Sequence, residues 1–363
     1  MQSRLLATLE ADARTSLDRD VWARAVCRIA AHYARQGHTD LALEAMGRVR
    51  KEFGATPSPA AKTWLMFADG VFHFFHDRWD EGAVAMRSAY NLAFSERASL
   101  ARPTCAAWLA HMDFNLLRFE DMAKHLEEAL TLARIDDHQA LARASLVLAD
   151  ALHYAGDFQL ARPWYVKVRI HGSAEGDEAT LSALLHNVAA FRAGNVRMSD
   201  TFSTASPQEA KQALMQANSA WNFDTAIGTA SFQSLVPLLQ GQLLAVHRDF
   251  LSAERMLTTI DPGALERKSL PLLWVDLAWC LASQGRHDEA SIHATKAASL
   301  LDMSTDIDEV AYINSRLAQV ADIGGDASGA MRYKGVALEA LTKHASIQAS
   351  LRELLIPIAK LNV

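Results

Sequence analysis

Small side chains recur through this sequence at intervals close to 40 residues. One column follows a short turn in each segment, at Ala42, Gly82, Met122, Ala161, Ala253, Ala290 and Ala330, with only Met122 not small. A second column lies twelve residues before the first, at Ala30, Gly70, Ala110, Ala149, Gly241, Ala278 and Ala318. Such a period is typical of helical solenoids. Small side chains also let two antiparallel helices approach closely, so the columns predict repeated helix hairpins.

The 92-residue gap between Ala161 and Ala253 suits two repeats. A first helix is expected to end at Asn195, where the polar run RMSDTFSTAS follows. A second helix then restarts with Ser206 as N-cap, Pro207 at the first helical position and Glu209 closing a capping box. We therefore predict eight repeats over residues 21–342, with an insertion near 194–206.

Both ends of the chain have the pattern of amphipathic helices. Residues 2–17 and 345–361 are predicted to be cap helices, because terminal repeats otherwise expose an apolar face. The second carries the apolar run LLIPIAKL and could instead form a homodimer contact. No long linker interrupts the array, so one domain over residues 1–363 is expected.

Charge and composition exclude several classes of protein. The net charge of -6 does not fit a nucleic-acid binder, which usually has a basic excess. No run approaches the ~18 apolar residues of a membrane span, and the N-terminus does not have a signal-peptide pattern. Cys27, Cys105 and Cys280 are far apart and predicted to be buried free thiols. We expect a cytoplasmic protein without a membrane or nucleic-acid partner.

The repeat resembles the tetratricopeptide repeat, whose motif has a small residue at position eight, a turn near fifteen and Ala at twenty. The turn glycines here are Gly37, Gly156, Gly285 and Gly325. The resemblance covers nearly the whole chain, although the period is near 40 instead of the usual 34, and the motif's Trp is matched only at Trp274. It implies an all-α fold, an α-solenoid of about eight hairpins in a right-handed superhelix. Long-period variants of this kind look like sensor and scaffold segments of bacterial regulators.

The resemblance also implies that the first helices line a concave groove. Carried onto this sequence, the groove residues are Arg24, Arg28, Arg35, Trp64, Phe67, Phe74, Trp108, His111, Asn115, Arg143, Asp150, His153, Tyr154, Arg192, Gln242, Asp276, Trp279 and Arg316. This mixture of Arg, Trp and Tyr is typical of protein-binding hot spots. The aromatic members at 64, 67, 74 and 108 fit an inter-repeat core equally well, since a register error of one residue turns a helical position by about 100°.

No motif for catalysis or cofactor binding is present. The sequence lacks GxxxxGK[ST], GxGxxG, HExxH and GxSxG. His73 and His76 have no further ligand at a usual metal-site spacing, so no enzyme, metal or cofactor is expected. The leading hypothesis is a scaffold or adaptor that binds a partner protein or peptide in the groove. An acidic or mixed-charge peptide that reaches Arg24, Arg28 and Arg143 fits this hypothesis. The alternative is a ligand- or peptide-sensing module of a bacterial signalling or transcription system.

Overall fold

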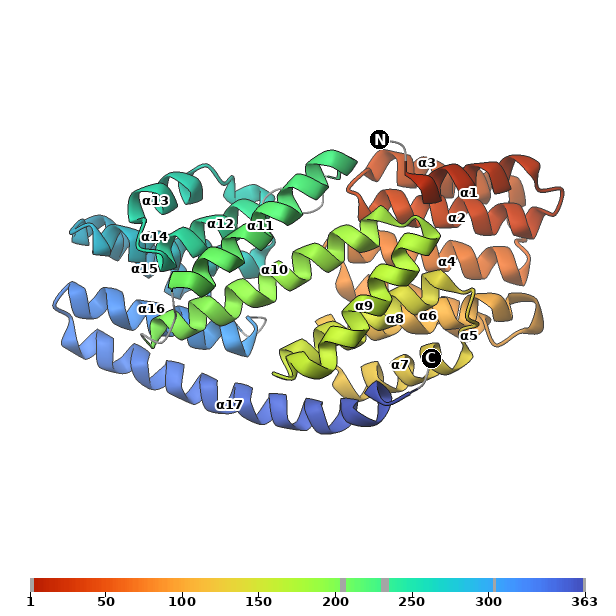
Figure 1. The fold of residues 1–363 in the computed structure, drawn as a ribbon. Helices are drawn as coiled ribbons and strands as arrows, with labels where there is room; N and C mark the ends of the chain where they lie inside the picture. Colours follow the sequence, from red (N-terminus) through yellow and green to blue (C-terminus); the bar gives the residue numbers. More distant parts are fainter. Residues whose placement is uncertain (1–2, 203–206, 230–234, 303–304, 362–363) are drawn as a thin grey trace. The chain divides into compact units, whose positions relative to one another are not determined.

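The computed structural model describes residues 3–202, 207–229, 235–302 and 305–361. These residues form α-helices and three short 3-10 turns, with no strand among them (Figure 1). The prediction of an all-α repeat fold is confirmed. The α-helices are α1 (Arg4–Thr15), α2 (Arg19–Arg35), α3 (Thr39–Phe53), α4 (Pro59–Phe74), α5 (Trp79–Leu92), α6 (Arg102–Asn115), α7 (Phe119–Leu132), α8 (His138–Tyr154), α9 (Phe158–Glu175), α10 (Glu178–Thr201), α11 (Pro207–Ile227), α12 (Leu235–Val246), α13 (Phe250–Thr258), α14 (Leu270–Ser283), α15 (His287–Leu300), α16 (Ile307–Ile323) and α17 (Ala327–Ala359). The 3-10 turns are η1 (Glu96–Ala101), η2 (Pro262–Ala264) and η3 (Arg267–Ser269).

The turn inside each hairpin has one conformation throughout the described repeats. In seven hairpins the residue seven positions after the first-helix small residue has a positive φ between 56° and 82°, at Gly37, Asp77, Leu117, Gly156, Arg248, Gly285 and Gly325. Glycine adopts this left-handed region without a Cβ clash, whereas other residues pay roughly 1–2 kcal/mol. The glycines therefore mark four of the turns in the sequence, and the other three are held by their surroundings.

The two small-residue columns face one another where the hairpin helices touch. A Cβ added to Gly82 on α5 would lie 3.0 Å from the Gly70 carbonyl oxygen and 3.0 Å from the Phe74 nitrogen on α4. A Cβ on Gly70 would lie 3.1 Å from the Met86 nitrogen. Backbone atoms cannot swing aside as a flexible side chain can, so the close approach requires these glycines.

Gly82→Ala should therefore destabilise the protein by disturbing the close packing between α4 and α5. We expect a net loss of about 1–2 kcal/mol in the free energy of unfolding, because overpacking outweighs the gain in helix propensity. Gly47→Ala in α3 is the matched control, since nothing lies within 4 Å of its added Cβ. That control should gain about 0.5–1 kcal/mol. Urea denaturation followed by circular dichroism compares the two, and equal effects would contradict the close packing.

Two predicted boundaries are wrong. The polar run after Asn195 does not break the helix, because α10 continues to Thr201. Buried ion pairing of Asp200 holds this last turn, which local propensity does not favour. The helix expected at 345–361 is not a separate element either, since α17 runs unbroken over 33 residues. Nothing in TKHASIQAS forbids helix, so the two predicted helices merge. The predicted helix at 2–17 is α1, and the expected N-cap at Ser206 lies outside the described residues.

The described chain divides into two compact units. Unit 1 holds described residues within 1–184, 224–231 and 350–363, and unit 2 those within 185–223 and 232–349. The core of unit 1 is rich in aromatic rings: Phe67 lies 5.4 Å from Trp64 and 6.2 Å from Trp108, ring centre to ring centre. The three cysteines are buried free thiols, as predicted. One continuous repeat domain stays a prediction.

Candidate functional site

The first helices of repeats one to four surround a small cavity in unit 1. Its walls include Arg28 and Arg35 from α2, Phe67 from α4, Trp108 from α6 and Gln139 from α8. Its volume is about 10 Å³, room for about one water molecule. We call the surface that α2, α4, α6 and α8 present around this cavity the inner face of unit 1. Leu5 and Leu9 of α1 also line this cavity.

Arg35 is held by a carboxylate at the start of α10. Its guanidinium donates to both oxygens of Asp177, at 2.9 and 2.5 Å, and to the Thr180 hydroxyl at 3.0 Å. Although burial raises the pKa of Asp177, the Arg35 charge and hydrogen bonds hold it well below its usual range. The pair is a buried, bidentate ion pair, in which two parallel hydrogen bonds strengthen the contact between the guanidinium and the carboxylate.

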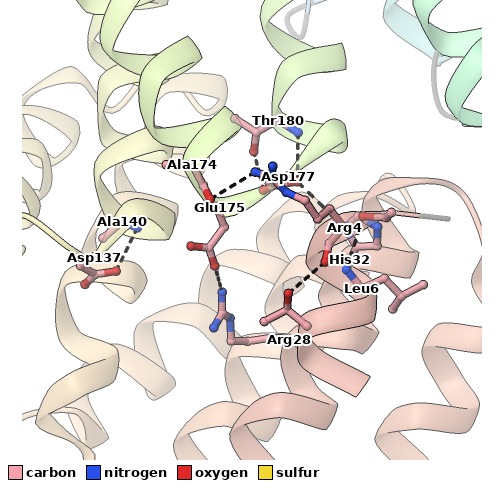
Figure 2. A network of polar contacts seen from close by, with 12 residues as sticks. Arg4, Leu6, Arg28, His32, Asp137, Ala140, Ala174, Glu175, Asp177 and Thr180 are labelled. Carbon is pink, nitrogen blue, oxygen red and sulfur yellow. Dashed lines mark hydrogen bonds and ion pairs between the residues drawn. The ribbon is translucent and has the colours of Figure 1, made fainter. Parts of the chain in front are cut away.

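The turn between α9 and α10 gathers further contacts from α1 and α2 (Figure 2). Arg28 pairs with Glu175, and Arg4 donates to the Ser173 carbonyl. The Leu5 amide donates to the Gly176 carbonyl at 3.2 Å. The spacing rule for first helices did not predict Glu175 or Asp177, because both lie at the junction between α9 and α10 and outside the first-helix positions.

Arg143 lacks the partners that its neighbours have. It is 4 % exposed, and its guanidinium carbon lies 4.0 Å from the centre of the Trp108 ring. No described residue makes a hydrogen bond or ion pair with it, and its Nε is buried without a partner. Burial, with a smaller effect of Arg35, lowers the pKa of Arg143 to about 9, although the charges of Asp177 and Asp150 act in the opposite direction. At neutral pH this side chain therefore stays charged, with unused hydrogen-bond donors beside the cavity.

The histidines near this surface are neutral. Burial, then the Arg35 charge, lowers the pKa of His32 to about 4. Burial, then the Arg143 charge, lowers the pKa of His111 well below its ordinary value. Neither imidazole can be a second permanent cation at neutral pH.

Acidification should weaken the fold through His32. Below pH ~6.5 the unfolded chain binds a proton at this residue, while the folded chain does so only near pH 4, so stability falls as the pH drops through this window. Up to about 2 kcal/mol is expected to be lost between pH 6.5 and pH 5. Urea midpoints across this range should show a smaller slope for His32→Gln than for the wild type. The control His287→Gln, at an exposed histidine, should leave the pH dependence of the urea midpoint unchanged. If His32→Gln has the same pH dependence as the wild type, His32 is not the group responsible.

Unit 2 brings four other predicted groove residues into one buried network. Asp276 accepts from Gln242 at 2.9 Å and from the Tyr312 hydroxyl. Arg316 stacks on Trp279 at 4.7 Å and donates to Asp200 of α10 at 2.5 Å. These contacts join α10, α12, α14 and α16, and they satisfy the charge of Arg316 within the protein.

The remaining predicted residues lie apart from the cavity. Trp64 and Phe74 are buried in the inter-repeat core, at 6 % and 9 % exposure. Asp150 and His153 contact the Tyr165 hydroxyl of α9 at 2.9 and 3.2 Å, inside the fourth hairpin. Tyr154 packs on Phe114, and the Asn115 side chain donates to the His111 carbonyl. Arg24 on α2 and Arg192 on α10 are half-buried. A role for any of these in binding stays a prediction.

No family model and no curated protein matches this sequence. Among solved structures, RapI in its apo form is similar, with 13 % identity, a TM-score of 0.53 and coverage of 77 % of this chain and 98 % of that one. The fold is a tetratricopeptide-like helical repeat. A tetratricopeptide repeat protein from Parabacteroides merdae ATCC 43184 also aligns, at 10 % identity and a TM-score of 0.40, over 84 % of this chain and 98 % of that one. At these identities the tetratricopeptide-like likeness concerns the fold alone.

Among the described helices, none combines the length and apolarity that crossing a bilayer requires. Within the same part of the chain, no three His, Cys, Asp or Glu side chains come together as a possible metal site. The inner face of unit 1 is the candidate site, and Arg143 adjoins it by stacking on the cavity residue Trp108.

Proposed function

We propose that this chain is a protein-interaction scaffold that binds an acidic segment of a partner protein, or an acidic peptide, on the inner face of unit 1. The unpaired, buried charge of Arg143 carries the proposal. Burying an ionised group without a hydrogen-bonded counter-charge is expensive, so such groups are normally paired. A carboxylate supplied by a partner would provide the missing acceptor.

The surroundings of Arg143 favour a protein or peptide ligand. Trp108 gives a flat apolar wall against the Arg143 guanidinium, whereas Arg28 and Arg35 already pair with Glu175 and Asp177. Guanidinium groups bind carboxylates through two parallel hydrogen bonds, and Trp with Arg dominates the binding energy of many protein interfaces.

Affinity capture from the native host tests this proposal with three variants. Arg143→Met removes the positive charge, and Arg143→Lys keeps a positive charge but cannot make two parallel hydrogen bonds to a carboxylate. Arg134→Met is the control, because the Arg134 side chain is 74 % exposed. We expect the partner to be lost with Arg143→Met, reduced with Arg143→Lys and retained with the control. Glu-rich peptides should compete for the partner's site, whereas Gln-matched peptides should not. A partner captured equally by all three variants would contradict the inner face as the site.

A ligand-sensing module is the second candidate, and the small volume of the cavity favours it. A site with room for about one water must rearrange to admit a ligand, so occupancy can be coupled to a conformational change. Addition of a low-molecular-weight extract should then raise the melting temperature of the wild type and leave that of Arg143→Met unchanged. No shift with any extract would count against this candidate.

A further inference from the structure

We infer that helix α1 is a resident, imperfect ligand of the inner face of unit 1, and that a partner helix carrying a carboxylate competes with it. The inference rests on the proposed function and adds the shape of the partner and the regulation of the site. The partner's chemistry is an amphipathic helix with two apolar anchors one turn apart and an acidic side chain beside them.

α1 already binds in the way such a partner would. Leu5 and Leu9 are four residues apart, on one face of the helix, and are 6 % and 2 % exposed. Both line the cavity together with Arg28, Arg35 and Trp108. The segment that covers the inner face is thus a single short helix that presents two leucines.

The polar attachment of α1 is confined to its first turn. Ser3 donates to Glu178 at 2.5 Å, the Arg4 amide donates to the same carboxylate at 3.2 Å, and the Leu5 amide donates to Gly176. After Leu5, no described residue of α1 makes a side-chain hydrogen bond or ion pair outside its own helix. A 12-residue helix is only marginally stable by itself in water, so α1 depends on this narrow polar contact and on the burial of Leu5 and Leu9.

α1 makes apolar contacts with the inner face but does not pair the charge of Arg143. Its carboxylates, Glu10 and Asp12, make no hydrogen bond or ion pair with Arg143, which stacks on the cavity residue Trp108 and has a buried Nε without an acceptor. A partner helix with similar leucines and a well-placed carboxylate would make the apolar contacts of α1 and also pair Arg143. The difference lies in the acid, which makes the site selective for partners that carry one.

The competition is testable with the full chain and a synthetic helix. The probe is a fluorescein-labelled peptide of residues 3–16, SRLLATLEADARTS, and binding is measured by fluorescence anisotropy. In the wild type α1 acts at the high effective concentration of a tethered segment, so the peptide should bind weakly. The Leu5→Ser/Leu9→Ser variant should bind the peptide at least about tenfold more tightly, since its own α1 no longer holds the site. Leu17→Ser is the matched control, because Leu17 is 100 % exposed.

The acid requirement is measured with two altered peptides. Replacing the residue equivalent to Leu9 by Glu or by Gln removes the same anchor, and only Glu brings a charge. With the Leu5→Ser/Leu9→Ser chain, the Glu peptide should bind about tenfold more tightly than the Gln peptide. Adding Arg143→Met should abolish that preference. Helicity of each chain, measured by circular dichroism, confirms that the variants remain folded, and Leu9→Ala serves if the double change unfolds unit 1.

The outcomes separate this inference from the proposed function. Equal peptide affinity for the wild type and the leucine variant would overturn the role of α1, and equal affinity for the Glu and Gln peptides would overturn the acid requirement. Both results leave partner capture untouched. Conversely, a peptide that binds as expected while capture ignores Arg143 would support α1 as the cover of the inner face and reject the proposed partner site.

Discussion

Asp200→Ala should destabilise unit 2 by about 3–5 kcal/mol, the usual effect of removing one partner of a buried ion pair. The Arg316 and Asp200 side chains are 1 % and 4 % exposed, and 2.5 Å separates Arg316 Nη2 from Asp200 Oδ2. Without this carboxylate, the Arg316 guanidinium would keep only the neutral Gln319 and Tyr312 oxygens as acceptors. Arg248, which also pairs with Asp200, can turn toward water because about half of its side chain is exposed.

Urea denaturation monitored by circular dichroism measures this loss. Glu289→Ala is the control, because the Arg286–Glu289 pair is an exposed ion pair at the start of α15 and should contribute little to stability. If the two substitutions shift the midpoint equally, the buried pair does not stabilise unit 2 in the way its geometry implies.

Arg143→Met should have the opposite sign and raise the free energy of unfolding by about 1–3 kcal/mol. The fall of its pKa to about 9 corresponds to on the order of 5 kcal/mol against keeping the charge, at ~1.4 kcal/mol per pKa unit. The cation–π contact with Trp108 offsets ~2 kcal/mol of this cost, and the substitution removes that stabilising contact. The same substitution should abolish partner binding, so stability and function would move in opposite directions, as is common at binding sites.

Arg35→Met is the matched control for this prediction. It also removes a guanidinium of the inner face, but it leaves Asp177 buried without its two hydrogen bonds, so it should cost about 3–5 kcal/mol. Thermal and urea unfolding of both variants tests the contrast. A loss of stability with Arg143→Met would show that this arginine has a structural partner and would remove the main argument for a ligand.

The repeat could be predicted from the sequence because its cause is local. Small residues are needed wherever two hairpin helices touch, and their spacing is visible without knowing any tertiary contact. The left-handed conformation of Asp77, Leu117 and Arg248 could not be predicted, because no glycine marks it in the sequence. The length of α10 was mispredicted since Asp200 is held by helices far away in the sequence.

The candidate site was predicted in part. The first-helix positions correctly brought Arg28, Arg35 and Trp108 to one cavity wall. The rule could not show that Asp177 and Glu175 neutralise two of the arginines, because these acids lie at a junction between repeats. It also could not show that α1 covers the surface. The pairing of Arg28 with Glu175 and of Arg35 with Asp177 joins segments more than a hundred residues apart, which no periodic pattern records.

The last turns of α17 have a consequence for synthesis on the ribosome. Leu351, Leu355 and Ile358 are 1 %, 0 % and 5 % exposed, and this end of the helix is grouped with unit 1, where Arg352 pairs with Asp157 at 2.9 Å. Translation proceeds from the N-terminus, so most of unit 1 emerges before the segment that completes it. A nascent chain halted before residue 350 would carry the first four hairpins with part of their apolar surface uncovered. Chaperones should therefore engage the early-made unit until the end of α17 has emerged from the ribosome, an order of events that the repeat pattern alone would not suggest.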